Sequence, residues 1–303
     1  MEQVANKMKE VLKEWNLDAC VKQIYHSAWN VNNEYVLKEY GDKNNLRRNI
    51  EMFKVLYEAG LPVPKICPLA NGAEFCEVEG KMYLLATKLK GNNIVDIHQC
   101  DKAWFYNFGV ILAKLHIAFK ECEKTMSFWD NSLLEEMKGW VSENLDKFAP
   151  DYLPKDEIDK TIFELSQNYQ DLPSQLIHRD VHLGNFLFEE RNFSGYIDFD
   201  LSQSNIRIFD LCYFLLGILT AEDNNRLEIE DWYIIVNKVV EGYDSLMPLK
   251  KIEKQSIVCV MKSIELLFTA YFLGIGDETS AKKAADLFLL VCRKEENILE
   301  ILP

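Results

Sequence analysis

Short alternating runs of hydrophobic and polar residues dominate the first part of the chain. An amphipathic helical pattern covers residues 4–15, and a second helix, expected over 45–59, ends where Gly60 and two prolines follow. Four runs have the length and composition of strands: 21–28, 34–40, 73–78 and 81–87. An Asn-rich break at 30–33 predicts a hairpin between the first two runs. This part of the chain is therefore expected to form a small antiparallel β-sheet that carries one main helix.

Helical spacing of apolar residues dominates the rest of the chain, beginning with a long pattern over 104–119. Short strands return only between 175 and 200, around polar loops, and the pattern is helical again from 208 onward. The sequence therefore predicts an α+β protein of two lobes. A β-rich lobe at 1–87 is expected to join directly to a larger, mostly helical lobe at 88–303.

The composition narrows the range of partners. With 34 Lys and Arg against 48 Asp and Glu, the formal net charge is -14, which disfavours nucleic-acid binding and attracts small cations to acidic clefts. The eight cysteines are scattered without a C-x-x-C pair, as expected for reduced thiols in the cytoplasm. The start lacks a signal-peptide pattern, and the longest apolar stretch, 211–219, has about half the length of a membrane span. We therefore expect a cytoplasmic protein that neither crosses a membrane nor binds nucleic acid.

The candidate chemistry lies in a polar loop between two apolar strands, at residues 178–185, and at the end of the next strand. Phosphoryl transfer from a nucleotide depends mainly on positioning and on the neutralisation of charge. One carboxylate must orient the attacking hydroxyl group and accept its proton, and Asp180 suits that role. Carboxylate and carboxamide oxygens hold Mg2+ in proteins, and Asn185 and Asp198 suit that role.

The spacing of these residues is specific. The pattern H-R-D-x-x-x-x-N begins at His178 and ends at Asn185, and D-F begins at Asp198, which is the pairing of loops found in eukaryotic-like kinases. The stretch resembles the aminoglycoside phosphotransferase and choline kinase superfamily, whose loop typically reads H-G-D-x-H-x-x-N. His182, two residues after Asp180, favours this superfamily over the protein kinases. Only eleven residues separate Asp198 from Asp210, and no A-P-E motif follows, which leaves no room for the activation segment of a protein kinase.

The resemblance implies a protein-kinase-like bilobal fold. It also implies an enzyme that uses Mg2+ as a cofactor and transfers the γ-phosphoryl group of ATP or GTP to a hydroxyl group of a small molecule. By the same resemblance, Lys38 contacts the phosphates, and Glu51 on the following helix is its ion-pair partner, with Glu58 as the alternative. The backbone groups of Thr87 and Leu89 correspond to the hinge that pairs with adenine.

Five further residues are candidates for supporting roles. His178 is expected to tie the loop to the core of its lobe, with Asp210 as the candidate partner, and His182 either packs the loop or belongs to the site. Arg179 stands where the superfamily usually has glycine. Asp200 stands where a glycine would complete D-F-G, and it is either a further carboxylate near the metal or a polar loop residue.

The sequence leaves the acceptor open. An aminoglycoside suits the acidic composition, and choline, ethanolamine, homoserine, methylthioribose or a sugar also fit. The charged segments 222–226 and 228–231 are either a solvated surface or, as in the superfamily, a source of acidic groups that recognise a cationic acceptor. The segment from Ile197 to Leu211 also resembles kinase-like spore-coat proteins of Gram-positive bacteria. A pseudokinase with a binding or structural role is therefore the alternative from another class.

Overall fold

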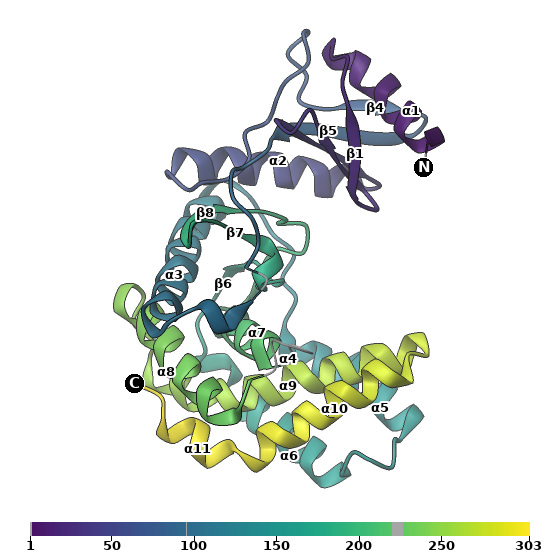
Figure 1. Ribbon diagram of the computed structural model, residues 1–303. Helices are drawn as coiled ribbons and strands as arrows, with labels where there is room; N and C mark the ends of the chain where they lie inside the picture. Colours follow the sequence, from purple (N-terminus) through teal and green to yellow (C-terminus); the bar gives the residue numbers. More distant parts are fainter. Residues whose placement is uncertain (1, 95, 220–226) are drawn as a thin grey trace. The chain divides into compact units, whose positions relative to one another are not determined.

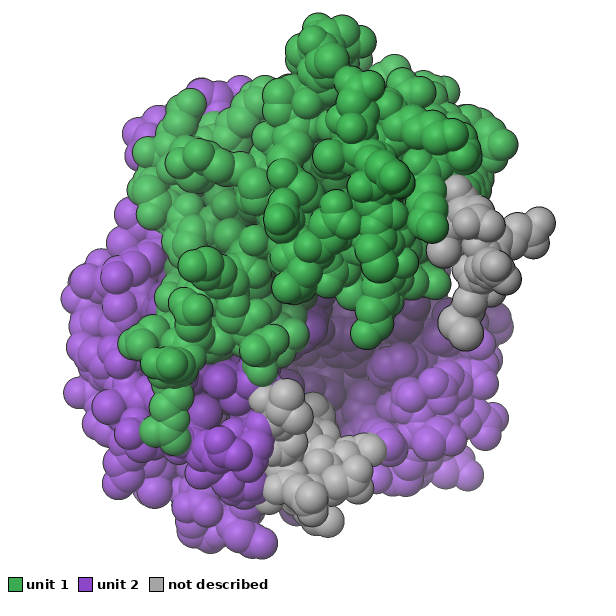
Figure 2. Space-filling model, turned by 45° about the horizontal axis from the view of Figure 1, so that its top comes forward, with its two compact units in different colours: residues 1–93, 184–200 green, residues 94–183, 201–303 purple. Residues whose placement is uncertain are grey.

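The computed structural model describes residues 2–94, 96–219 and 227–303, so the charged segment 222–226 lies outside the described residues. The chain forms two compact units (Figure 2). Unit 1 comprises Met1–Asn93 and Gly184–Asp200, and unit 2 comprises Ile94–Leu183 and Leu201–Pro303. The sequence analysis placed 184–200 with the larger lobe, whereas the structure places this segment in unit 1.

Unit 1 is built around a five-stranded antiparallel sheet with the order β1-β2-β3-β5-β4. Its strands are β1 (Val21–Tyr25), β2 (Ala28–Val31), β3 (Tyr35–Tyr40), β4 (Cys76–Val78) and β5 (Lys81–Thr87). Its helical elements are α1 (Glu2–Leu12), the short η1 (Lys13–Trp15) and α2 (Lys43–Glu58), which runs along the sheet in Figure 1. The side chain of Asp42 accepts a hydrogen bond from the backbone of Asn45, which caps the start of α2.

The first strands differ from the prediction. The run expected as one strand over 21–28 contains a turn at residues 26–27, and β2 runs through the first half of the expected Asn-rich turn. The second turn instead uses Asn32 and Asn33, whose φ values of 53° and 59° lie in the left-handed region that asparagine tolerates. The first turn carries neither glycine nor proline, so its position could not be recognised from the residue types.

A two-stranded hairpin of β7 (Phe186–Glu189) and β8 (Asn192–Tyr196) completes unit 1. Backbone hydrogen bonds in both directions join Asn92 and Phe188, at 2.8 and 2.9 Å. Just before this bridge, Gly91 has a φ of +96°, and a Cβ atom there would lie 2.4 Å from Ser194 Oγ. These long-range contacts explain why a segment that follows the helical region in sequence folds with the N-terminal sheet.

Unit 2 is mostly helical, with one two-stranded sheet of β6 (Ser174–Ile177) and β9 (Gln203–Ile206). Its longer helices are α3 (Lys102–Thr125), α6 (Lys155–Asn168), α7 (Ile208–Leu219), α8 (Ile229–Leu246), α9 (Lys251–Ile275) and α10 (Glu278–Arg293). Its shorter helical elements are η2 (Ile97–Gln99), α4 (Leu133–Glu136), η3 (Met137–Val141), α5 (Ser142–Phe148), η4 (Tyr169–Asp171) and α11 (Glu295–Glu300), while η5 (Leu183–Asn185) spans the boundary between the units.

Helix α9 forms the centre of unit 2 and packs against α6, α7 and α10; it lies side by side with α10 in Figure 1. Among the described residues it is the one helix long and apolar enough to cross a membrane, but 78% of its apolar window is buried within the chain. A core helix has the same composition, and burial on several faces accounts for it here. The α+β architecture predicted from the sequence, a small antiparallel sheet with one main helix and a larger helical part, is confirmed.

Candidate active site

Unit 1 brings Lys38, Asp198 and Asp200 together. The Nζ atom of Lys38, on β3, lies 2.9 Å from Oδ1 of Asp198 and 2.8 Å from Oδ2 of Asp200. On α2, the Nδ2 group of Asn49 donates a hydrogen bond of 2.9 Å to the other oxygen of Asp200. Residues from β3, from α2 and from the segment after β8 therefore bring two carboxylates and one ammonium group together.

Burial and charge act in opposite directions within this cluster. Burial lowers the pKa of Lys38, but the charges of Asp200 and Asp198 outweigh it and hold that pKa above its usual value. Burial raises the pKa of Asp200 despite the opposing effect of the Lys38 charge. The lysine thus stays charged and partly neutralises two carboxylates that repel each other.

The backbone around Asp198 is held in an uncommon conformation. Asp198 has a φ of +62°, in the left-handed region that costs an L-residue free energy. The preceding N–H group, of Ile197, donates a 3.1 Å hydrogen bond to the carbonyl of Asn185, and Asn185 is itself 6% exposed. The following residue, Phe199, is buried edge-on against Phe53 of α2 at a centroid distance of 5.7 Å. These contacts fix the positions of the two predicted metal ligands within unit 1.

The predicted ion pair between Lys38 and Glu51 is not formed. Glu51 pairs at 2.8 Å with Lys54, one turn along the same helix, and its side chain is half exposed. The α2 residue that reaches the cluster is the buried Asn49. Two residues correspond to about 200° around a helix, so Glu51 lies on nearly the opposite face. The alternative, Glu58, is exposed at the end of the helix.

The predicted hinge lies at the end of β5 in unit 1. The N–H group of Thr87 donates to the carbonyl of Lys65 at 2.8 Å, and the Thr87 hydroxyl accepts from the Lys65 N–H group at 2.9 Å. The side chain of Leu89 packs against Gly195, where a Cβ atom would lie 2.3 Å from its Cδ1 atom. Both sides of the hinge segment are therefore anchored to neighbouring parts of unit 1.

Unit 2 holds the start of the polar loop through Asp210 of α7. The carboxylate of this fully buried residue accepts hydrogen bonds from the backbone N–H groups of His178, at 2.7 Å, and Arg179, at 2.8 Å. The Nε2 atom of His116 lies 2.9 Å from the same carboxylate, and its Nδ1 atom lies 2.8 Å from the hydroxyl of Tyr243. The expected tie between His178 and Asp210 thus exists through the backbone, and His116 and Tyr243 are partners that the motif did not indicate.

The local contacts of Arg179 explain how an arginine fits where the superfamily usually has glycine. Its φ is +72°, a value that glycine adopts without strain. The guanidinium group pairs with Glu136 at 2.9 Å and lies 4.1 Å from the centre of the Phe209 ring. The ion pair and the cation–π contact offset part of the backbone strain.

The two carboxylate oxygens of Asp180, the next residue, have different partners. The hydroxyl of Tyr213, on α7, donates to Oδ1 at 3.1 Å, and Nε2 of His182 lies 3.4 Å from Oδ2. Burial raises the pKa of Asp180, but the interactions with His182, the charge of His178 and the hydrogen bond from Tyr213 outweigh it, so the pKa lies below its usual value. Asp180 is therefore an ionised carboxylate able to accept a hydrogen bond from a hydroxyl group.

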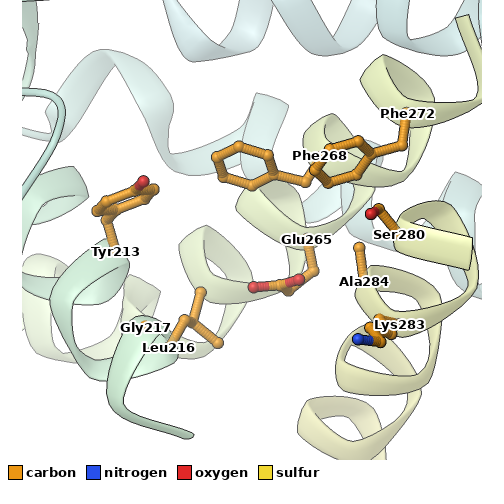
Figure 3. A pocket seen from close by; sticks show the side chains of 9 residues that line it. All are labelled: Tyr213, Leu216, Gly217, Glu265, Phe268, Phe272, Ser280, Lys283 and Ala284. Atoms are coloured by element: carbon orange, nitrogen blue, oxygen red, sulfur yellow. The ribbon is translucent and has the colours of Figure 1, made fainter. Parts of the chain in front are cut away.

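A cavity of about 280 Å³ adjoins Tyr213 within unit 2 (Figure 3). Helices α7, α9 and α10 form its walls, and Glu265 and Phe268 of α9 are among the residues that line it. Sequence reasoning missed both Tyr213 and Glu265, because each lies in an apolar helical pattern that indicates core. The spacing of Tyr213 three residues after Asp210, one helical turn away, is the one signal that could have indicated it.

Comparison with known proteins gives a family and two groups of relatives. The model of the phosphotransferase enzyme family matches residues 23–249. The chain is 25% identical over 233 residues to a homoserine kinase of Bartonella tribocorum, covering 75% of this chain and 68% of the relative. It is 29% identical over 196 residues to a homoserine kinase of Pseudomonas aeruginosa, covering 60% of this chain and 57% of the relative. The chain therefore spans about two thirds or less of the length of these two relatives.

Solved structures resemble the whole chain at low identity. The amicoumacin kinase hAmiN, in complex with AMP-PNP, Ca2+ and Ami, has a TM-score of 0.65 at 16% identity and covers 100% of this chain and 95% of its own. The GDP complex of wild-type aminoglycoside 2'-phosphotransferase-IIIa has a TM-score of 0.67 at 13% identity, with 96% and 98% covered. This likeness shows the fold alone, and it confirms the kinase-like fold predicted from the sequence.

Proposed function

Since this chain belongs to the phosphotransferase enzyme family, we propose that it transfers the γ-phosphoryl group of ATP or GTP to a hydroxyl group of a small molecule. Membership confirms the family and the enzyme class expected from the catalytic-loop motif, a small-molecule kinase. The observation that carries the proposal is the convergence of Lys38, Asp198 and Asp200 in unit 1. Positively charged groups and metal-binding carboxylates are what phosphoryl transfer requires, because its barrier is lowered mainly by positioning and charge neutralisation.

Unit 1 supplies the groups for the nucleotide. Lys38 would contact the phosphates, and the Thr87 carbonyl and the Leu89 N–H group would pair with the base, since the Thr87 N–H group already donates to Lys65. The oxygen donors of Asn185 and Asp198, with Asp200 beside them, suit Mg2+, which prefers hard oxygen ligands. When bound, Mg2+ would neutralise charge on the phosphates.

Unit 2 supplies the group for the acceptor. Asp180 would accept a hydrogen bond from the acceptor hydroxyl, orient its oxygen for attack and take its proton during transfer. The hydroxyl of Tyr213 donates to one oxygen of Asp180 and His182 lies beside the other, and these contacts would orient the carboxylate toward the acceptor hydroxyl. The depressed pKa of Asp180 keeps it ionised at neutral pH.

The acceptor is proposed as a small hydroxylated metabolite or antibiotic. The relatives are named as homoserine kinases and the structural neighbours as kinases of antibiotics, so both classes belong in the panel of acceptors to be tested. We also propose that the enzyme works in the cytoplasm, where ATP and Mg2+ are abundant, and that nucleic acid is not its partner, given its net charge of -14.

Replacing Asp180 by Asn tests the proposal. We expect the turnover of Mg-ATP with an active acceptor to fall by about 10²–10⁴-fold, the usual contribution of a positioned general base, while the affinity for ATP stays within about twofold. Asp171→Asn, at an exposed position before β6, is the matched control and should keep full turnover. Full turnover by Asp180→Asn would contradict the role of Asp180. ATP binding without transfer to any acceptor would favour a pseudokinase.

A further inference from the structure

A buried amide on α2 orients one of the carboxylates that Lys38 contacts. Asn49 is 1% exposed, and its Nδ2 group donates to Oδ1 of Asp200 at 2.9 Å. The same group also donates to the side-chain oxygen of Asn45, one turn earlier, at 3.3 Å. Burying an amide is unfavourable unless it forms hydrogen bonds, and a bond to a charged acceptor is stronger than one between neutral groups. The two bonds fix the direction of the Asn49 amide toward Asp200.

The same face of α2 contacts this segment at a second point. Phe53, one turn after Asn49, packs edge-on against Phe199 at a centroid distance of 5.7 Å. Residues four apart lie on one side of a helix, so both contacts come from a single face of α2. Two consecutive residues, Phe199 and Asp200, are therefore positioned by that face.

The two carboxylates beside Lys38 are held differently. Both oxygens of Asp200 have a donor within the protein, because Asn49 donates to Oδ1 and Lys38 lies 2.8 Å from Oδ2. Lys38 contacts Oδ1 of Asp198 at 2.9 Å, and the side chain of Asp198 is 44% exposed against 30% for Asp200. Asp200 is thus the more firmly fixed partner of the lysine, and Asp198 is the more accessible to a metal ion.

A lysine that serves a phosphate needs such a partner. Its ammonium group sits on a flexible four-carbon stem, and a misplacement of about 1 Å can lower a rate by about 10²-fold. In the kinase pattern, a glutamate on the helix supplies the carboxylate. Here Glu51 pairs with Lys54 instead, and α2 turns Asn49 toward the cluster. The carboxylate therefore comes from the segment after β8, and the helix supplies an amide.

We propose that Asp200, oriented by Asn49, is the carboxylate that fixes Lys38 for the phosphates of the nucleotide, and that this pair replaces the helix glutamate. The inference rests on the proposed function, because it assumes that Lys38 meets those phosphates. Asp200 and Asn49 are positioning residues: Asp200 acts through Lys38, and Asn49 acts through Asp200. Asp198 keeps its proposed role as a ligand of Mg2+.

A double-mutant cycle on nucleotide binding tests the proposal. Asn49→Leu removes the hydrogen bond to Asp200 without changing the charge. Isothermal titration calorimetry with Mg2+ measures the affinities for ADP and adenosine in wild type, Asn49→Leu, Lys38→Met and the double variant. The ratio of the two affinities isolates the phosphates, because both ligands share the base and the ribose. We expect Asn49→Leu to lower this ratio by about 3–10-fold, with adenosine binding within about twofold of wild type. In the Lys38→Met background the same change should alter the ratio by less than about twofold.

Three further variants keep the test decisive. Glu51→Gln, on the same helix, is the matched control and should leave the ratio within about twofold of wild type. Asn49→Ala adds no volume and should reproduce the coupling to Lys38 if the leucine variant fails to fold. Asp200→Asn should lower the ratio only where Lys38 is present. An unchanged ratio in both Asn49 variants, a loss in Glu51→Gln, or a loss that persists in the Lys38→Met background would overturn the proposal.

The outcome is separate from that of the proposed function, because ADP binding requires no acceptor. Coupling between Asn49 and Lys38 in a chain that phosphorylates no acceptor would refute the kinase proposal only. Transfer that depends on Asp180, together with independent effects of Asn49 and Lys38 on ADP binding, would refute the positioning role only.

Discussion

Replacing Glu265 by glutamine tests the electrostatics of the cavity in unit 2 without any ligand. Burial raises the pKa of this residue from 4.5 to about 8. Below pH 4.5 the side chain is neutral in both the folded and the unfolded states, so it imposes no pH-dependent penalty there. As the pH rises from 4.5 toward 8, Glu265 ionises in the unfolded chain but stays protonated in the folded chain. The free energy of unfolding of the wild type therefore falls. One pKa unit corresponds to about 1.4 kcal/mol, so the loss is about 3 kcal/mol at pH 7 and at most about 5 kcal/mol above pH 8.

Glutamine cannot ionise, so the stability of the Glu265→Gln variant does not fall with pH in this way. Its amide remains desolvated in the cavity, which costs about 1–3 kcal/mol at every pH. The free energy of unfolding of Glu265→Gln, measured relative to the wild type by urea denaturation, should therefore rise by about 3–4 kcal/mol between pH 5 and pH 8.5. Glu278→Gln, at an exposed position near the start of α10, should show no such trend. A difference between Glu265→Gln and wild type that stays constant over this pH range would refute the reasoning.

Three other substitutions test the polar loop and its supports. Tyr213→Phe removes a hydrogen bond that favours the ionised form of Asp180, so kcat should fall by about 3–10-fold and the acid limb of the kcat–pH profile should move to higher pH, with the KM for ATP unchanged. Arg179→Ala keeps the strained φ but loses the pair with Glu136, and chemical denaturation should show a destabilisation of about 1–3 kcal/mol, whereas an unchanged midpoint would contradict the account. Gly91→Ala should destabilise unit 1 by more than about 1 kcal/mol, visible as faster hydrogen exchange in β7 and β8.

The parts of the site that a local pattern determines were predictable. The loop from His178 to Asn185 and the strand that ends at Asp198 combine a rare spacing with apolar flanks, and the family match confirms the resemblance drawn from them. The site roles assigned to these residues and to Lys38 stay predictions, which the proposed substitutions test. The main helix was also evident, because its apolar positions follow one face from Leu46 to Leu56.

The remaining parts depend on contacts between distant segments. Which face of α2 meets Lys38 depends on how the helix is rotated against the sheet. The sequence favoured Glu51, with Glu58 as the alternative, whereas Asn49 was not a candidate. The assignment of 184–200 to unit 1 follows from the backbone pairing of Asn92 with Phe188, which no local sequence pattern predicts. Glu265 was not a candidate, because it stands alone in an apolar helical pattern and the cavity that it lines forms only where α7, α9 and α10 pack together.

The most direct test of the central claim is phosphorus NMR of wild type and Asp180→Asn, each incubated with Mg-ATP and the panel of acceptors. The account predicts a new phosphomonoester resonance with at least one small hydroxylated acceptor, formed at the same rate as ADP by the wild type and suppressed at least a hundredfold in Asp180→Asn. Release of inorganic phosphate alone across the panel, or a phosphomonoester formed equally by both proteins, would contradict it.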